Sequence, residues 1–221
     1  MKTNQEFKNE ALAALKGNWA SAVVCAIVLI LITCVTYTPS YATNIATMTA
    51  IQLSPDVATA FITSGVLLSI FIFYPLMVGY SVTHNKLIVE GDTALTGNMF
   101  KVMFNGYLHN VWGMFLMYLY ISLWSLLLII PGIIKIFSYS MTPYILQDYP
   151  ELSANQAINL SRKMMKGHKF DFFWLNLSFI GWGVLCLFTF GIGYVWLMPY
   201  VQTASAAFYQ EVKKEYNANN L

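Results

Sequence analysis

Long runs of apolar residues, separated by short polar stretches, constrain the fold of this chain more than any other feature. A helix needs about 20 apolar residues to cross a bilayer, and backbone groups in hydrocarbon have to bond within their own segment. The chain has six such runs, the fourth one shorter, over about residues 19–37, 57–80, 110–130, 133–146, 172–188 and 194–212. The sequence therefore predicts an all-α membrane protein with six transmembrane helices, in a single polytopic domain over residues 1–221.

The composition supports this class and excludes others. Hydrophobic residues make up 57% of the chain and charged residues only 10%, whereas a soluble domain carries about 25% charged residues. The net charge of +2 excludes nucleic-acid binding, because that function needs a clustered basic surface. A cleaved signal peptide ending near Ala42 is the alternative interpretation of the first run. The length of that run and the amphipathic residues 1–18 before it favour a membrane helix instead.

The distribution of basic residues predicts the orientation in the membrane. If the N-terminus faces the cytoplasm, 11 of the 12 Lys and Arg residues fall on that side, namely Lys2, Lys8, Lys16, Lys86, Lys101, Arg162, Lys163, Lys166, Lys169, Lys213 and Lys214. Only Lys135 falls on the opposite side. Because connections rich in Lys and Arg stay in the cytoplasm, we expect both termini there.

A weak internal repeat divides the chain into three units. The units cover about residues 3–90, 91–150 and 151–216. In each unit an amphipathic stretch ends in a glycine just before an apolar run, and these glycines are Gly17, Gly106 and Gly167. The second run of each unit carries a proline, and these are Pro75, Pro143 and Pro199. The pattern predicts three helical hairpins, each preceded by a cytoplasmic surface helix.

Two of the expected surface helices have clear start signals, and the last one is basic. Thr3 with Glu6, and Ser153 with Gln156, fit the capping-box pattern. Four basic residues follow within eight positions, Arg162, Lys163, Lys166 and Lys169. Each basic residue near an anionic surface adds about 1 kcal/mol of attraction. The four are therefore candidate contacts for anionic lipid, although an anchor that only fixes topology is the simpler interpretation.

Polar residues inside the fourth and sixth runs are the other candidate contacts. The fourth run contains Lys135, Ser138 and Tyr139, and the sixth contains Tyr200 and Gln202. Such side chains bond across helices or line a wet cavity, and we expect them to contact lipid or a small ligand in the second case. For Lys135 the simpler interpretation is snorkelling, because it follows the predicted turn closely.

The chain lacks a recognisable catalytic or metal-binding set. His84, His109 and His168 have no second His or Cys at ligand spacing, and His168 with Asp171 is at best a weak pair. No nucleophile elbow, phosphate-binding loop, zinc-protease or dinucleotide motif occurs. We therefore predict no catalytic residue, cofactor or metal, and we favour a non-enzymatic function over an enzymatic one.

Several stretches resemble a known family. The segments 130–135, 139–144, 150–154, 164–169, 177–182, 189–193 and 196–200 are similar to the domain-of-unknown-function 975 family of bacterial integral membrane proteins. The resemblance is strongest over about residues 125–212. It implies a multi-pass protein of the bacterial cytoplasmic (inner) membrane, and it brings no activity or functional residue.

Three functions follow in order of preference. The first is non-enzymatic binding or movement of lipid or a small amphipathic ligand, with membrane lipids, including anionic ones, as partners. The alternative is a structural protein that assembles with another membrane component, and the third is an intramembrane enzyme. A cavity open between helices favours the first function, whereas a flat apolar face over tightly packed polar helices favours the second.

Overall fold

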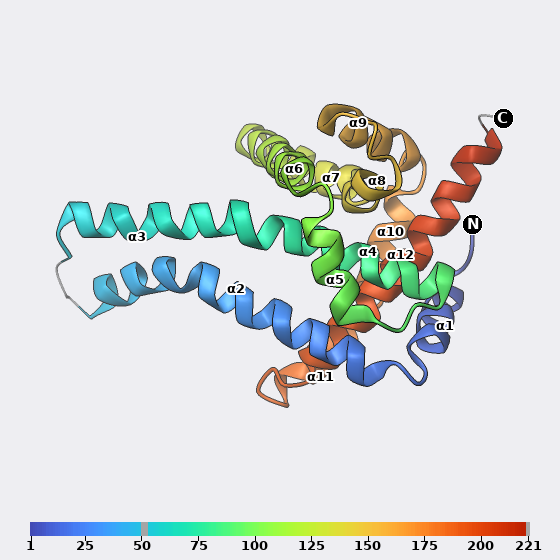
Figure 1. Cartoon of the computed structure of the whole chain (residues 1–221), viewed down its shortest axis with the longest axis horizontal. Coiled ribbons are helices and arrows are strands. Elements are labelled where there is room, and N and C mark those ends of the chain that lie inside the picture. The colour runs from blue at the N-terminus through green and yellow to red at the C-terminus, as the bar shows by residue number, and fades with distance from the viewer. Residues whose placement is uncertain (50–52, 220–221) are drawn as a thin grey trace.

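The computed structural model describes residues 1–49 and 53–219, and over these residues it contains helices and turns but no strand (Figure 1). The elements are α1 (Asn4–Leu15), α2 (Trp19–Met48), α3 (Pro55–Leu68), a π-helical turn η1 (Ser69–Phe73), α4 (Tyr74–Glu90), α5 (Leu95–Phe104), α6 (Tyr107–Leu127), α7 (Ile129–Tyr139), α8 (Thr142–Asp148), α9 (Ala154–Met164), α10 (Lys169–Leu177), α11 (Ile180–Leu187) and α12 (Tyr194–Asn219). The all-α prediction is confirmed.

Five stretches of the described residues are long and apolar enough to cross a membrane. They are Trp19–Pro39, Pro55–Glu90, Tyr107–Leu127, Ile129–Asp148 and Lys169–Leu187. The sixth predicted run forms the first part of α12, which is not among them. The helices are those of a membrane protein, with one fewer candidate span than the sequence predicts.

The predicted start signals form as expected. Thr3 Oγ1 accepts a hydrogen bond from the Glu6 N–H, and the Glu6 carboxylate accepts one from the Thr3 N–H. Ser153 and Gln156 make the same reciprocal pair at the start of α9. Each box satisfies two N–H groups that have no partner inside the helix.

The three predicted glycines share one backbone conformation. Gly17, Gly106 and Gly167 have φ of 85°, 65° and 95°, in the left-handed region that residues with a Cβ avoid. Each follows a short helix, α1, α5 or α9, and precedes an apolar one, α2, α6 or α10. The chain therefore reverses direction in the same way at the start of α2, α6 and α10.

The three predicted prolines lie in the helices that form the core. Pro143 occupies the first turn of α8, where a helix loses no hydrogen bond to proline. Pro75 follows the π-helical turn η1 inside the continuous helical stretch Pro55–Glu90. Pro199 lies inside α12. The large apolar side chains of α4 between Pro75 and Leu87 are buried except for the half-buried Met77, and Tyr144 of α8 and Tyr209 of α12 are buried as well.

The short helices α1, α5 and α9 pack on these three core helices in a repeated manner. Helix α5 packs on α4, α9 packs on α8, and α1 packs on α12. Each short helix also contacts one of the helices that follow the three glycines. Helix α5 contacts α2, α9 contacts α6, and α1 contacts α10. The contacts of α1 with the last helices close the arrangement into a ring.

Three helix pairs extend from this core and carry the exposed apolar surface. We call them the first pair (α2 and α3), the second pair (α6 and α7) and the third pair (α11 with the start of α12). Figure 1 shows the first pair side by side and extending beyond every other helix, with both chain ends at the opposite end of the molecule. Large apolar side chains along all three pairs are exposed in the isolated chain, as expected for surfaces that contact lipid.

Candidate functional site

A central pocket of about 340 Å³ lies between α4, α6, α7, α8, α10 and α12. Three methionines from two of these helices line its apolar side, Met77, Met114 and Met117. The polar side is formed by residues from five helices and the turn after α7, namely Ser81, Tyr118, Tyr139, Ser140, Tyr144, Gln202 and Ser205. None of the side chains that line this pocket carries a charge.

A series of hydrogen bonds, interrupted by one ring stack, leads from this pocket to Lys213 of α12. Gln202 Nε2 donates to Tyr144 Oη at 2.9 Å, and the Tyr144 ring stacks on Tyr209 with centroids 4.7 Å apart. Tyr209 Oη donates to an Asp148 carboxylate oxygen at 2.7 Å, and Lys213 Nζ donates to the same oxygen at 2.6 Å. These contacts hold the polar wall of the pocket in one arrangement.

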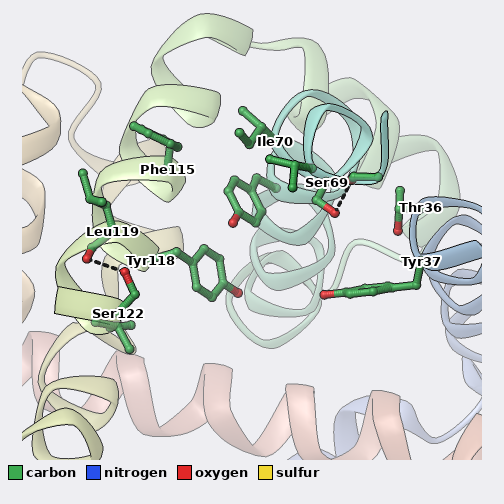
Figure 2. Close-up of a pocket in the computed structure, with 12 residues that line it drawn as sticks. Thr36, Tyr37, Ser69, Ile70, Phe115, Tyr118, Leu119 and Ser122 are labelled. Atoms are coloured by element: carbon green, nitrogen blue, oxygen red, sulfur yellow. Dashed lines mark hydrogen bonds between the residues drawn. The ribbon is translucent and has the colours of Figure 1, made fainter. Parts of the chain in front are cut away.

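A second hollow, the lateral groove, has a volume of about 500 Å³ and opens between α2, α3 with η1, and α6 (Figure 2). Figure 2 shows the hydroxyl ends of Tyr37 and Tyr118 pointing toward one another across it. The Tyr118 ring stacks on Tyr74 with centroids 4.7 Å apart. Tyr118 and Ile121 line both the lateral groove and the central pocket, so these two side chains separate the two hollows.

The hydroxyl groups of the lateral groove fall into two kinds. Ser69 and Ser122 donate their protons to the carbonyls of Gly65 and Leu119, as the dashed lines of Figure 2 show. In contrast, within the described part of the chain no hydrogen bond involves the hydroxyls of Tyr37, Tyr74 and Tyr118. Three phenol groups are therefore available to a molecule in the groove.

The π-helical turn η1 shapes one wall of this groove. Ser69 and Ile70 of η1 line it directly. A π-helical turn shifts the backbone bonding by one residue, and the Phe71 carbonyl accepts a hydrogen bond from Tyr107 Oη at the start of α6. Such turns inside longer helices are frequent at functional sites.

The structure brings some of the predicted contact residues together and separates others. Tyr139 and Gln202 both line the central pocket. Ser138 is buried beside α9, where its hydroxyl donates to the Ile134 carbonyl. Tyr200 lines a different pocket, of about 420 Å³, together with the indoles of Trp19, Trp182 and Trp196.

Lys135 lies against aromatic rings of the second pair. Its ammonium is 4.4 Å from the centroid of the Trp124 ring and 5.6 Å from that of Tyr139. It is not among the residues that line the central pocket. Aromatic faces attract a cation, so this position stabilises the lysine without a bound ligand.

The four basic candidates occupy the outside of α9 and the turn after it. Arg162 and Lys163 border a shallow surface pocket of about 510 Å³ with Gln156 and Asn159. Lys166 follows α9, and Lys169 begins α10. Within the described residues none of these four side chains forms an ion pair with an acidic one, so their charges are available to anions.

The sequence does not predict most of the residues that line the lateral groove. Tyr37, Tyr74 and Tyr118 come from three different apolar runs, in which a tyrosine is also expected at the membrane interface. Only Pro75, next to Tyr74, marked this region in the sequence. The helix packing brings the three rings together.

Comparison with known protein families identifies one relationship. Residues 110–216 match the family described as "Protein of unknown function (DUF975)". The match confirms the resemblance seen in the sequence over these residues, and the function of that family is unknown. No curated protein and no solved structure matches the chain significantly.

Proposed function

We propose that this chain is a non-enzymatic membrane protein that binds or moves a lipid or a small amphipathic ligand. The observation that supports this most is the position of Tyr118 and Ile121, which line both the lateral groove and the central pocket. The groove opens between helix pairs whose outer faces are apolar. A lipid tail in the groove would therefore lie next to a polar pocket that accepts its head.

The residues of the central pocket favour an uncharged head group. No charged side chain lines it, and an unpaired charge is costly to bury. Ser140 and Ser205 already donate their protons to the carbonyls of Phe137 and Val201, so each offers only lone pairs to a ligand. Gln202 uses its amide N–H on Tyr144 and retains its carbonyl oxygen. A head group with hydroxyl donors fits this set of acceptors.

Native mass spectrometry of the protein extracted in mild detergent tests this function. Ser122→Trp fills the lateral groove, and we expect the ligand-bound fraction to fall by about tenfold or more, equal to about 1.4 kcal/mol. Leu126→Trp is the control, because Leu126 lies one turn further along α6, is 86% exposed and lines neither hollow. Equal retention of lipid by the two variants would contradict the proposal, and a retained protein partner would support the structural alternative.

We also propose the membrane arrangement that the sequence predicts. The three helix pairs enter the bacterial inner membrane from the cytoplasmic side, α1, α5 and α9 lie at that surface, and both termini are cytoplasmic. The basic residues support this orientation. The repeated packing of α1, α5 and α9, together with the three left-handed glycines, supports three structural repeats over about residues 3–90, 91–150 and 151–216.

A further inference from the structure

The three helix pairs differ in how far they extend past the polar short helices. On the second pair, Tyr120 Oη donates to Asn155 Oδ1 of α9 at 2.7 Å, and Ser161 of α9 donates to the Ser138 carbonyl at 3.0 Å. Helix α9 carries exposed Arg162 on its outer face, which has to remain near water. These contacts therefore mark the membrane surface on the second pair.

Only a short part of the second pair lies beyond this level. From Tyr120 the helix α6 continues for seven residues to Leu127, which is about 10 Å at 1.5 Å per residue. Helix α7 returns from Ile129 to Ser138 over nine residues, about 13 Å. Both lengths are less than half of the hydrocarbon core, which is about 30 Å thick.

The third pair is similarly short. Lys8 Nζ of α1 donates to the Ser178 carbonyl at 2.9 Å and lies 4.5 Å from the Phe179 ring centroid. Helix α1 also carries Glu6 and Glu10 on its exposed side, so this contact lies at the membrane surface. The 12 residues from Ser178 to Phe190 reach about 18 Å at most.

The first pair is longer. The Tyr107 hydroxyl contacts the Phe71 carbonyl close to the end of α5, which carries the exposed Lys101. From Phe71 back to Pro55 the chain is helical over 16 residues, about 24 Å. Figure 1 shows that this pair extends well past the ends of the other two.

The turns of the three pairs also differ in polarity, because the turn of the long first pair is polar and the turns of the two short pairs are apolar. The first pair carries the polar residues Thr49, Ser54 and Asp56 at the far ends of α2 and α3, and these residues suit an aqueous surface. The second pair turns within residues 126–134, where every residue is Leu, Ile, Pro or Gly. In the third pair Phe188, Phe190 and Ile192 are exposed around the turn, and Phe190 is 99% exposed. Apolar turns of this kind are disfavoured in water.

The backbone of the third turn is suited to hydrocarbon. Each N–H from Phe188 to Leu197 donates to an acceptor within the turn or helix, including Gly191 N–H to the Cys186 carbonyl at 3.0 Å and Gly193 N–H to Thr189 Oγ1 at 3.0 Å. A turn that is bonded in this way can be surrounded by lipid tails without unsatisfied donors.

We propose that only the first pair crosses the membrane, and that the second and third pairs are re-entrant. Their turns end among the acyl chains of the leaflet on the side of α1, α5 and α9. This inference rests on the proposed membrane arrangement and replaces six crossings by two. It places Lys135 in the same leaflet as the other basic residues, so all 12 Lys and Arg lie on one side.

Single cysteines in intact cells test this depth, in a background where Cys25, Cys34 and Cys186 are replaced by Ala. An impermeant maleimide added outside should label Met48→Cys, whose native side chain is 87% exposed at the end of α2. Leu128→Cys and Phe190→Cys should remain at background both before and after the membrane is permeabilised, and should react fully once the protein is denatured in detergent. Lys166→Cys is the control for the surface side, and should react only after permeabilisation.

Nitroxide labels attached at positions 128 and 190 then measure how deep these two positions lie in the bilayer. We expect high accessibility to oxygen and low accessibility to a nickel chelate, as for the middle of the bilayer. External maleimide labelling at either position, or nickel accessibility typical of the far surface, would overturn the inference. If Lys166→Cys rather than Met48→Cys reacts from outside, the proposed orientation fails, while protection at Leu128 and Phe190 still supports the re-entrant pairs.

Discussion

Gly79 and Gly97 lie on neighbouring helices, but only one of these positions requires a glycine. A Cβ on Gly79 of α4 would lie 2.2 Å from the carbonyl oxygen of Met99 in α5, a distance at which the backbones have to move apart. A Cβ on Gly97 of α5 would meet no atom within 4 Å. The close packing of α5 on α4 therefore depends on the absence of one side chain.

Gly79→Ala should destabilise the protein, whereas Gly97→Ala should not. Overpacking of this kind costs about 1–3 kcal/mol, while replacing an exposed helical glycine by alanine gains about 0.5–1 kcal/mol. Thermal unfolding in one detergent, followed by tryptophan fluorescence, measures the difference. Equal midpoints for the two variants would show that α4 and α5 do not approach as closely as described.

At the scale of the element, α1 depends on its first turn. The hydrogen bonds from the Thr3 N–H and hydroxyl to the Glu6 carboxylate, at 2.6 and 2.8 Å, hold the pKa of Glu6 below its ordinary value of 4.5. Because the folded pKa is lowered, this contribution to stability is complete above the ordinary pKa. It is lost as the pH falls through the lowered one.

Thr3→Ala should loosen the start of α1 and raise the pKa of Glu6 toward its ordinary value. Loss of a threonine cap costs about 1 kcal/mol of helix stability. The α1 amides should exchange hydrogen faster at neutral pH. The protection of these amides should also change less between neutral and acid pH than it does in the unchanged protein. Thr3→Ser retains the hydroxyl and is the control, so a similar increase in exchange for the Ser variant would contradict the capping role.

At the scale of the whole molecule, charge is concentrated at one end. Both termini lie away from the projecting first pair (Figure 1). Near the N-terminus Lys2 forms an ion pair with Glu10 of α1, and Lys213 of α12 forms one with Asp148. The four basic residues on and after α9 add positive charge without acidic partners among the described residues. This end of the molecule therefore has the charge expected of a surface that faces anionic head groups.

Replacing Arg162, Lys163, Lys166 and Lys169 by Gln should reduce the preferential copurification of anionic lipids. At about 1 kcal/mol for each basic residue, the loss amounts to several kcal/mol of surface attraction. The control replaces Lys16, Lys86, Lys101 and Lys214 by Gln, which removes the same net charge elsewhere. If lipid analysis shows an equal loss in both variants, the attraction is a general property of the basic surface and not of α9.

Local features of the fold could be read from the sequence. The helices follow from long apolar runs, the caps at Thr3 and Ser153 from short-range hydrogen bonds, and Gly17, Gly106 and Gly167 from a backbone angle that other residues avoid. The caps and the glycine conformations each depend on residues within about one helical turn, and the apolar runs are continuous in the sequence. The sequence also predicted Tyr139 and Gln202 as contact residues, because polar groups inside apolar runs need partners.

The tertiary structure alone decided which of these groups meet. Gln202 bonds to Tyr144 across 58 positions of the chain, and the groove joins Tyr37 to Tyr118 from helices with no common sequence signal. Hydropathy counts how many residues are apolar, but the depth of each helix pair depends on where the polar helices α1, α5 and α9 pack along it. That position is set by long-range contacts, which hydropathy does not record. The sequence therefore predicts six crossings, whereas the two crossings that we propose rest on the packing.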